Sequence, residues 1–354
     1  MPSHWSAAFG GAECQVSYIT KKLLSYAEFD LTFLARRVNQ SFEPNQYKII
    51  QIQSCFKKLD RYAFLLGTKS LLESLNKIKP HVIYQRVACS YTGVAAWYAK
   101  KNNAKLIWHI SHDMDVSPRT RDLGPRLKIA DQKILEYGIR NATNIIAQTR
   151  TQSELLEKYY GRAADKVIKN FHPKPSEPII KTSKLKVVWI ANFKPAKQPE
   201  LFVRLAKELS NKLDASFIMM GRIKSDNNYQ KTLDDINETE SLSYLGELEQ
   251  CDVNNVLSSA DLLVNTSVME GFSNTFIQAW MREVPVVSLC VDPDDILETN
   301  RIGIKAGSYE KMCDAIIKLA LDPELRAEMG RRGRQYALEN HSLKNVEKIV
   351  ELLR

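Results

Sequence analysis

The segment Asn265–Ser288 reads NTSVMEGFSNTFIQAWMREVPVVS, and it decides the fold of the sequence around it. The apolar run Asp261–Asn265 that leads into it predicts a buried strand. Ser273 and Asn274 are residue types that begin helices, so we expect a helix from there and a further strand opening at residues 285–287. A buried strand, a short loop, a helix and another buried strand predict a parallel sheet with helices on its faces.

The loop between this strand and this helix holds the residues that we expect to bind a ligand. The first free amides of the helix, around Phe272–Thr275, and its positive dipole end predict an anion site. Gly271 lets a ligand approach the backbone closely. Glu270 precedes the amides and Gln278 lies one turn into the helix, so both reach the same ligand. One acid, one amide and free N–H groups suit a molecule with hydroxyls beside phosphates, such as a sugar nucleotide.

The segment resembles the retaining GT-B glycosyltransferases of family 4, the group 1 type, whose hallmark is E-G-F-x-N-x-x-x-E-A. This chain has Gln278 where the family has its second Glu, and the rest of the pattern is matched by Glu270, Gly271, Phe272, Ser273, Asn274 and Ala279. The resemblance implies two Rossmann-like domains that face each other across a cleft. It also implies that Glu270 contacts the hydroxyls of the transferred sugar and that residue 278 grips the ribose, here through a neutral amide.

Other parts of the second half match the family in the expected order. VVWIANFKPAKQPELF, residues 187–202, is similar to the first strand and loop of the donor domain. Lys197 matches the family's lysine and is predicted to bind the donor diphosphate as a point charge. Asn192 stands where the family usually has arginine. The strand-end turn YLGEL implies that Gly246 and Glu247 lie near the base.

The first half matches the family less closely. Gly10 and Gly11 resemble the glycine loop that opens the acceptor domain beside the donor phosphates, although the family's strand before that loop has no counterpart in the preceding nine residues. By resemblance, His109 is the histidine that faces the transferred sugar, while a structural role is the alternative. His112 with Asp113 is the second candidate.

Apolar runs and amphipathic stretches alternate along the whole chain, which predicts two doubly wound α/β domains. We expect an acceptor-side domain over residues 1–172, a proline-rich linker over 173–184 and a donor domain over 185–335. A C-terminal helix over 336–354 is expected to pack back on the first domain. Strands are predicted at 31–34, 48–52, 81–84, 105–110, 144–147, 186–190, 215–220, 243–245, 261–265 and 284–289. Helices are predicted at 12–26, 62–78, 91–101, 125–140, 152–160, 198–213, 253–260, 274–282, 309–321 and within 323–353.

Composition bounds the location and the partners. The 354 residues include no apolar run long enough to cross a bilayer and no signal-peptide pattern, so we expect a cytoplasmic protein. The six scattered cysteines favour buried free thiols over a zinc site or disulfides. The net charge of +9 is concentrated in residues 1–180, which hold 27 Lys and Arg against 15 Asp and Glu. This asymmetry suggests contact with an anionic membrane surface or a polyanionic acceptor.

We therefore predict an enzyme that transfers a sugar from a nucleotide diphosphate sugar, UDP by family frequency, to an acceptor, with retention and without a metal ion or other cofactor. The expected partner is an unidentified acceptor, such as a lipid-linked saccharide, in cell-surface polysaccharide or glycolipid synthesis. No nucleic acid is expected as a partner. The acidic run from Asp292 to Asp295 is the segment to check for a metal site. A sugar-nucleotide 2-epimerase and a catalytically silent nucleotide-sugar-binding protein are the alternatives. A dinucleotide oxidoreductase is disfavoured because no G-x-G-x-x-G follows a strand.

Overall fold

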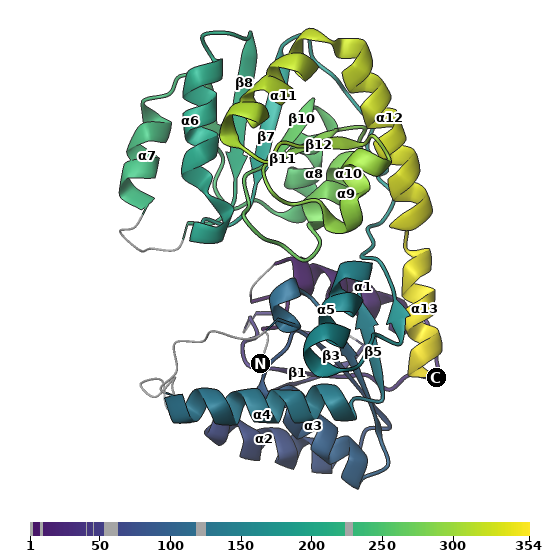
Figure 1. Cartoon of the computed structure of the whole chain (residues 1–354). Coiled ribbons are helices and arrows are strands. Elements are labelled where there is room, and N and C mark those ends of the chain that lie inside the picture. Colours follow the sequence, from purple (N-terminus) through teal and green to yellow (C-terminus); the bar gives the residue numbers. More distant parts are fainter. Residues whose placement is uncertain are drawn as a thin grey trace. The chain divides into compact units, whose positions relative to one another are not determined.

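The computed structural model describes residues 3–7, 10–39, 41–44, 46–52, 63–117, 125–223 and 229–354. The chain divides into two compact units (Figure 1). Unit 1 comprises Met1–Asn170 together with Leu343–Arg354, and unit 2 is the single stretch Phe171–Ser342.

Unit 2 contains a six-stranded parallel sheet in the order β12-β11-β10-β7-β8-β9. Counted along the chain, this is the order of a doubly wound sheet, whose direction of winding reverses between its first and fourth strands, here β7 and β10. The strands are β7 (Leu185–Ile190), β8 (Ala215–Met220), β9 (Leu242–Tyr244), β10 (Leu262–Asn265), β11 (Val286–Ser288) and β12 (Gly303–Lys305). The helices are α6 (Pro199–Leu209), α7 (Gln230–Asn237), α8 (Gln250–Ser258), α9 (Asn274–Trp280), α10 (Ile296–Thr299), α11 (Tyr309–Leu321) and α12 (Pro323–Asn340).

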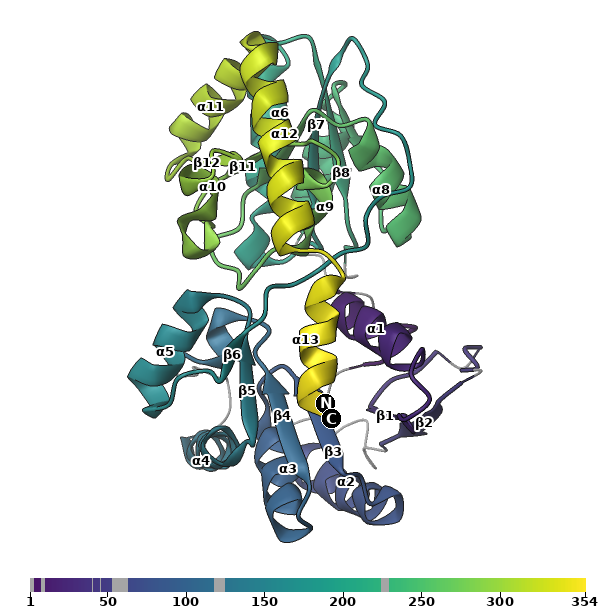
Figure 2. The ribbon, with the colours of Figure 1, turned by 90° about the vertical axis from the view of Figure 1, so that its right-hand side faces the viewer.

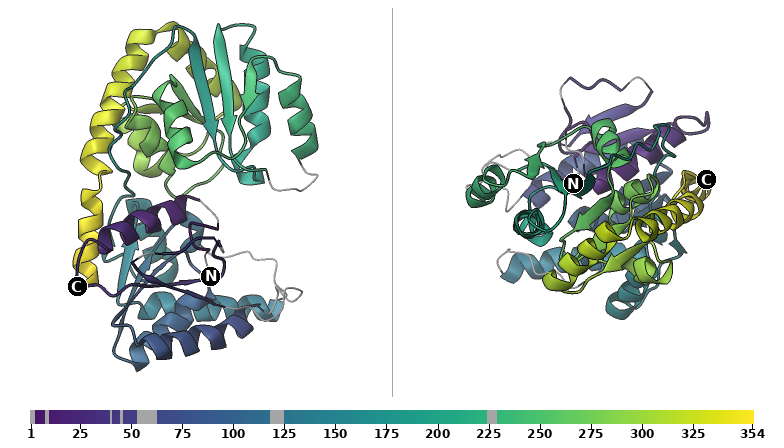
Figure 3. Two further views of the ribbon diagram at one scale, coloured as in Figure 1. Left: turned by 180° about the vertical axis from the view of Figure 1, so that it is seen from behind. Right: turned by 90° about the horizontal axis from the view of Figure 1, so that it is seen from above.

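Both faces of this sheet are covered, which explains why its strands are apolar throughout. Trp189 and Phe217 pack with Phe202 of α6 on one face, where α7 and α11 also contribute. On the other face Leu263 packs with Phe276 and Trp280 of α9, together with side chains of α8. Figure 1 and Figure 3 show the helices lying on either side of the strands.

Unit 1 contains a four-stranded parallel sheet, β3-β4-β5-β6, and a separate two-stranded parallel pair, β1-β2 (Figure 2). The described residues before α1 form no strand, and His4 N donates to Arg37 O at 2.8 Å. The strands are β1 (Thr32–Ala35), β2 (Lys48–Gln51), β3 (Val82–Arg86), β4 (Lys105–His109), β5 (Asn144–Ala147) and β6 (Lys166–Val167). The helices are α1 (Gly11–Leu23), α2 (Ala63–Ile78), α3 (Ser90–Lys101), α4 (Pro125–Asn141) and α5 (Arg150–Tyr160), and α13 (Lys344–Leu353) joins them from the end of the chain.

The last helix is anchored to the first through side chains of α1 and the loop after it. Glu347 accepts from Tyr26 Oη at 2.5 Å and pairs with Lys22 Nζ at 2.7 Å, while Arg354 pairs with Glu28 at 2.8 Å. Figures 2 and 3 show α13 in yellow beside α1 in purple. The predicted single helix over 336–354 is wrong in one respect, because the helix ends at Asn340 in unit 2 and a new one begins at Lys344 in unit 1.

The alternation of strands and helices is confirmed, with differences at short elements. Four short elements, β6, β12, α7 and α10, are not among those expected from the sequence. The proline-rich segment 173–184 has no helix or strand and groups with unit 2, where Ile180 N donates to Ser258 O at 3.0 Å. The first unit ends at Asn170 in the structure, two residues before the predicted boundary.

The structure also bears on two expectations, about membrane spans and about the cysteines. Among the described residues, no helix combines the length and the apolar run needed to cross a bilayer. The five described cysteines are free, but the prediction that they are buried is wrong for Cys251 and Cys290, which are exposed. Cys55 lies outside the described residues.

Candidate active site

The strongest constellation in unit 2 lies where β7 and β10 end, at the point where the winding of the sheet reverses. Lys197, in the loop after β7, pairs with Glu270, in the loop after β10, with 2.7 Å between Nζ and Oε1. The side chains are 23% and 12% exposed, so the pair is mostly buried but open to solvent. Ligands of doubly wound sheets bind at this edge, beyond the carboxyl ends of the strands.

Backbone contacts hold the two loops in a fixed relation. Thr266 Oγ1 donates to the carbonyl of Lys197 at 2.6 Å and lies 2.9 Å from the indole N–H of Trp189, which donates to it. Val268 N donates to the carbonyl of Ala196 at 3.0 Å. Because the loops are joined beside the ion pair, the charges of Lys197 and Glu270 are positioned before any ligand binds.

Glu270 receives three donors on one carboxylate oxygen. Besides Lys197, Asn265 Nδ2 donates to Oε1 at 2.9 Å and Ser267 Oγ at 2.7 Å. No described residue donates to Oε2, which leaves that oxygen for a ligand hydroxyl. Burial alone would raise the pKa of Glu270, but the Lys197 ammonium and the two hydrogen bonds outweigh it and hold the pKa below its ordinary value. The carboxylate is therefore charged at neutral pH.

Asn192 and the turn after β9 join the neighbouring loops. Asn192 Oδ1 accepts from the backbone N–H of Arg222 at 3.0 Å, so its amide connects the loops after β7 and β8. Gly246 O accepts from Gly221 N at 2.8 Å, and Glu247 lies 3.8 Å from the guanidinium of Arg222. These contacts place three predicted donor-binding residues at the carboxyl edge, with structural partners there.

The beginning of α9 gives a smaller surface than the sequence suggested. Gly271 and Phe272 are buried, and the Phe272 ring lies 4.8 Å from that of His341. Ser273 is the N-cap residue without a side-chain capping bond, and its hydroxyl lies 2.9 Å from that of Thr275. Asn274 and Thr275 are partly exposed, so the accessible part of this helix start is short.

Gln278, predicted to grip a ribose, is 4% exposed and packs against α8. Its Nε2 donates to Asn254 Oδ1 at 3.0 Å. The amide nitrogen therefore connects two helices, and only Oε1 remains for the predicted contact. This partner could not be read from the local motif, because Asn254 lies on a different helix.

In unit 1, His109 ends β4 and is fully buried. Its Nδ1 lies 2.7 Å from Tyr84 Oη, while Nε2 has no hydrogen-bond partner. Burial, and then the nearby Arg86 charge, lower the pKa of His109 well below its ordinary value, and burial raises the pKa of Tyr84 to about 12. Both groups are neutral at pH 7, and if Tyr84 donates to Nδ1, Nε2 carries the hydrogen.

Gly10 and Gly11 lie at the start of α1, Gly10 as the N-cap residue. A side chain at Gly10 would come within 2.7 Å of Glu13 Oε2, so a carboxylate lies over this glycine. A negative charge here works against binding phosphate at the helix start.

The remaining candidates have local partners. His112 Nδ1 accepts from Met114 N at 3.1 Å, and Asp113 Oδ1 accepts from Gln152 Nε2 at 3.0 Å. In the acidic run, Asp292 caps the backbone N–H of Leu297 at 2.9 Å. Within the described part of the chain, no three His, Cys, Asp or Glu side chains gather as metal ligands would.

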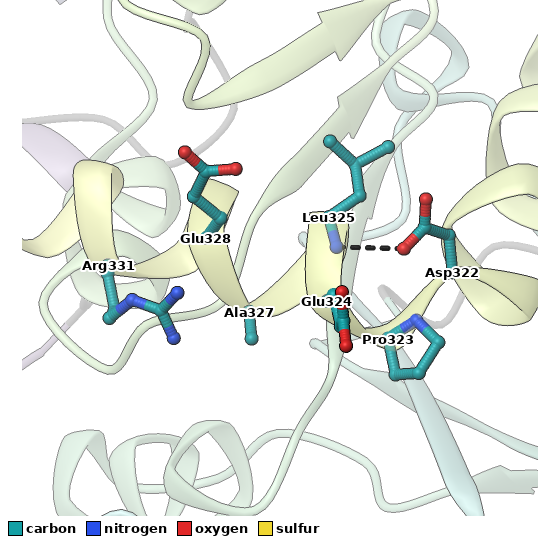
Figure 4. Close-up of a pocket in the computed structure, with 7 residues that line it drawn as sticks. All are labelled: Asp322, Pro323, Glu324, Leu325, Ala327, Glu328 and Arg331. Carbon is teal, nitrogen blue, oxygen red and sulfur yellow. Dashed lines mark hydrogen bonds between the residues drawn. The ribbon is translucent and has the colours of Figure 1, made fainter.

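A surface crevice of about 640 Å³ lies elsewhere, on the first turns of α12 (Figure 4). Arg326 on these turns lies 3.9 Å from Asp261, the residue that precedes β10. The crevice is therefore near the amino ends of the strands, at the edge opposite Glu270, and we do not assign the site to it. Its lining residues are Asp322, Pro323, Glu324, Leu325, Ala327, Glu328 and Arg331.

The arrangement of strands and helices is shared with known proteins. The chain is similar over its whole length to solved structures of sucrose-phosphate synthase from Thermosynechococcus elongatus, with TM-score 0.76, 13% identity and 97% and 92% of the two chains covered. It is similarly close to HepE from Anabaena in complex with UDP and glucose, with TM-score 0.76, 16% identity and coverage of 98% and 97%. At these identities the likeness shows the fold alone: it is the GT-B fold of glycosyltransferases, with two Rossmann-like domains.

Sequence comparison narrows the class. Residues 184–322, within unit 2, match the family model described as glycosyl transferases group 1. A curated relative, the poly(ribitol-phosphate) alpha-N-acetylglucosaminyltransferase of Staphylococcus aureus, is 26% identical over 165 residues, which are 44% of this chain and 32% of the relative. The match thus spans about a third of that relative's length.

Proposed function

We propose that the chain is an active glycosyltransferase that transfers a sugar from a nucleotide diphosphate sugar with retention of configuration. The observation that carries the proposal is the Lys197–Glu270 pair where the sheet winding reverses, inside the segment that matches the family. It presents a cation for a diphosphate beside a carboxylate for sugar hydroxyls, within one ligand's reach.

The proposed roles follow from the atoms left open. Lys197 has three N–H donors, and the contact with Glu270 uses one, so the ammonium can also contact the leaving diphosphate as its charge grows. The accessible amides near Asn274 and Thr275 are proposed to help. Glu270 Oε2 would accept from a sugar hydroxyl, and family resemblance assigns His109 to the same sugar. A donor phosphate oxygen takes the acceptor proton, so this scheme requires neither a protein base nor a metal ion.

UDP is the nucleotide that we propose for the donor, supported by family frequency and by the UDP bound in the HepE structure. An anionic or lipid-linked acceptor is supported by the excess of basic residues in residues 1–180 and by the phosphate polymer in the name of the Staphylococcus relative. We propose a cytoplasmic enzyme that contacts the inner membrane face peripherally and acts in cell-envelope polysaccharide or glycolipid synthesis.

A silent nucleotide-sugar-binding protein is the second candidate. Two observations favour it, because the amide of Gln278 is bonded to Asn254 and that of Asn192 to the backbone of Arg222. If both amides stay committed, each offers the donor only one open atom, Oε1 of Gln278 and Nδ2 of Asn192, while the Lys197–Glu270 pair remains.

The first experiment is ligand-observed NMR of the full chain with UDP, GDP, ADP and NAD, followed by sugar conjugates of the nucleotide that binds. We expect one nucleoside diphosphate to bind and one conjugate to be hydrolysed slowly, at a rate unchanged by EDTA. Binding without turnover would favour the silent protein, and turnover lost with EDTA would contradict the metal-free scheme.

The second experiment tests the role proposed for the Glu270 carboxylate. Glu270→Gln should lower sugar hydrolysis or transfer by about a hundredfold or more, because it removes the charge that orients the sugar. It should change the affinity for the free nucleotide by less than about fivefold. Equal losses of turnover and of nucleotide binding would contradict the role proposed for Glu270. Glu208→Gln, which neutralises an exposed carboxylate of α6 outside the proposed site, is the control and should leave both quantities unchanged.

A further inference from the structure

Unit 1 has a buried arginine at the corresponding edge of its own sheet. Arg86 is the last residue of β3, is 4% exposed, and pairs in register with His109 at the end of β4. Tyr84 lies two residues earlier and therefore on the same face of the sheet. Val87, which follows Arg86, has a positive φ of 68°, an unfavourable value for a β-branched residue.

The partners of the Arg86 guanidinium are neutral. Nε donates to Ser111 Oγ at 3.2 Å and Nη2 to Asn170 Oδ1 at 3.1 Å, and Asn170 in turn donates to Gln148 Oε1 at 3.1 Å. Nη1 has no hydrogen-bond partner. These neighbours follow β4, β5 and β6, so the polar groups gather at the carboxyl edge of the four-stranded sheet.

The guanidinium of Arg86 has no counter-ion in direct contact with it. None of the ion pairs formed among the described residues includes Arg86. The carboxylates of Asp115 and Glu13 are near enough for their charges to favour the protonated guanidinium, but the oxygens of Asp115 accept backbone N–H groups of Ala88, Ser111 and His112 at 2.8–3.1 Å. A guanidinium keeps its proton when buried, so an oxyanion in contact with it would compensate its charge more fully than these carboxylates do.

A second nitrogen without a hydrogen-bond partner lies on the residue next to Arg86 in the sheet. His109 Nε2 is buried without a partner, and His109 is the register partner of Arg86. With Tyr84 donating to Nδ1, the Nε2–H of the neutral imidazole and the guanidinium N–H offer two donors without adding a further charge. Sugar hydroxyls accept hydrogen bonds but do not compensate a cation, whereas phosphate or carboxylate oxygens do both.

We propose that Arg86 binds a phosphate or carboxylate group of a substrate through its open Nη1, with His109 Nε2 as a second donor. This site rests on the proposed function, since it takes a substrate of that transferase. The anionic group belongs either to the donor diphosphate or to an anionic acceptor. Its chemistry is an oxyanion in both cases.

The test uses inorganic phosphate as the probe and thermal unfolding of the full chain as the readout. To silence the proposed diphosphate site, it is done in the Lys197→Met background, with chloride at the same ionic strength as the reference. Phosphate at about 50 mM should raise the Tm, because it binds the folded state only. Adding Arg86→Met should abolish this shift, and adding Arg86→Lys should retain part of it.

A structural arginine gives a different pattern. In that case Arg86→Met lowers the Tm without phosphate and leaves the phosphate-induced shift unchanged, and this result would overturn the proposal. If Arg86→Met does not fold, Arg86→Lys decides, since a bidentate oxyanion site loses affinity when the planar fork is replaced by a point charge. An unchanged shift in Arg86→Lys, under those conditions, also counts against the site.

The source of the oxyanion is decided by titration of otherwise unmodified protein with UDP and with uridine. If the donor diphosphate binds Arg86, Arg86→Met weakens UDP about tenfold or more and leaves uridine unchanged. If the acceptor binds there, UDP affinity is unchanged and the KM for poly(ribitol phosphate), used as a phosphate-bearing probe, rises about tenfold. An Arg86-dependent phosphate shift in a wild type that binds no nucleotide would support the oxyanion site and overturn the transferase.

Discussion

The strands of the two units follow one topological order, but the units differ at the central strand. In unit 2, β7 lies between β10 and β8 and completes a six-stranded sheet. Aligned by order, β1 and β2 of unit 1 correspond to β8 and β9, and β3 and β4 correspond to β10 and β11. The position that β7 holds in unit 2 has no described strand in unit 1, where the sheet is divided into two and four strands.

The charges at the equivalent strand ends differ in the same way. Glu270 follows β10 and is compensated by Lys197 from the loop after the central strand. Arg86 ends β3, the counterpart of β10, and has neutral partners. In unit 2 the loop after the central strand thus supplies the counter-charge of Glu270, whereas no ion pair among the described residues of unit 1 includes Arg86.

The largest expected effect comes from a substitution at Gly221, where the loops after β7 and β8 of unit 2 approach each other closely. Gly221 has φ +144°, and a side chain there would lie 1.8 Å from the Ala191 carbonyl oxygen. Gly221→Ala should destabilise the chain by more than about 3 kcal/mol, because backbone must move on both sides. Gly246→Ala is the matched control, since Gly246 has φ +72° with open space around it, and should cost about 1–2 kcal/mol. Denaturant unfolding measures both, and equal losses would contradict this reading.

The next effect makes unit 2 resemble unit 1 by leaving a charge uncompensated. Lys197→Met should destabilise by about 2 kcal/mol, because Glu270 stays mostly buried without its cation. The double variant Lys197→Met with Glu270→Gln should recover most of this loss. Urea unfolding of the three proteins forms the check. A double variant no more stable than Lys197→Met would show that the pair is not the source of the loss.

Acid should affect His109 of unit 1 and Glu270 of unit 2 in separate pH ranges. The folded pKa of His109 is far below 6.5, so the unfolded chain binds the extra proton and stability falls as pH drops below about 6.5. Glu270 has a folded pKa below 4.5, and its contribution is present above that value and is lost as pH falls further. Because burial also lowers the pKa of His4 and of His172 to about 4, stability measured from pH 8 to pH 3 should keep part of the first slope in His109→Gln and lose the share that His109 contributes. Glu270→Gln should reduce the second slope in the same way. Unchanged slopes would refute the assignments.

The smallest effect relaxes strain in unit 1. Val87→Gly should stabilise by up to about 1 kcal/mol, because glycine adopts the positive φ of 68° without a steric penalty. Gln198, at φ 45° in the loop after β7, is unbranched, and Gln198→Gly should gain less. Chemical unfolding compares the two. A loss of stability in Val87→Gly would mean that packing of the side chain outweighs the strain.

Most of the fold could be predicted because the apolar patterns of its strands and helices extend over several residues. Elements of four or more residues with apolar strands or amphipathic helices were expected near their observed bounds, with the exception of α7 and α10. Three-residue β12 carries too little pattern, and the break between α12 and α13 at His341–Leu343 contains neither glycine nor proline.

The predicted site residues remain predictions, and the structure adds what spacing could not show. Lys197 and Glu270 were selected separately, yet their contact depends on β7 lying next to β10, a tertiary fact. Asn265, Ser267 and Thr266, which hold the pair, resemble ordinary loop residues in sequence. Arg86 was not selected, because a single arginine after a strand is usually exposed.

The position of α13 has a consequence for synthesis. Residues 1–170 are translated before unit 2, but the helix that completes their unit is translated after it. Unit 1 therefore stays incomplete while Phe171–Ser342 is made. A fragment ending at residue 170 lacks the partner of Lys22 and Tyr26, whereas unit 2 is one contiguous stretch. A premature stop at residue 343 would damage the domain that was translated first.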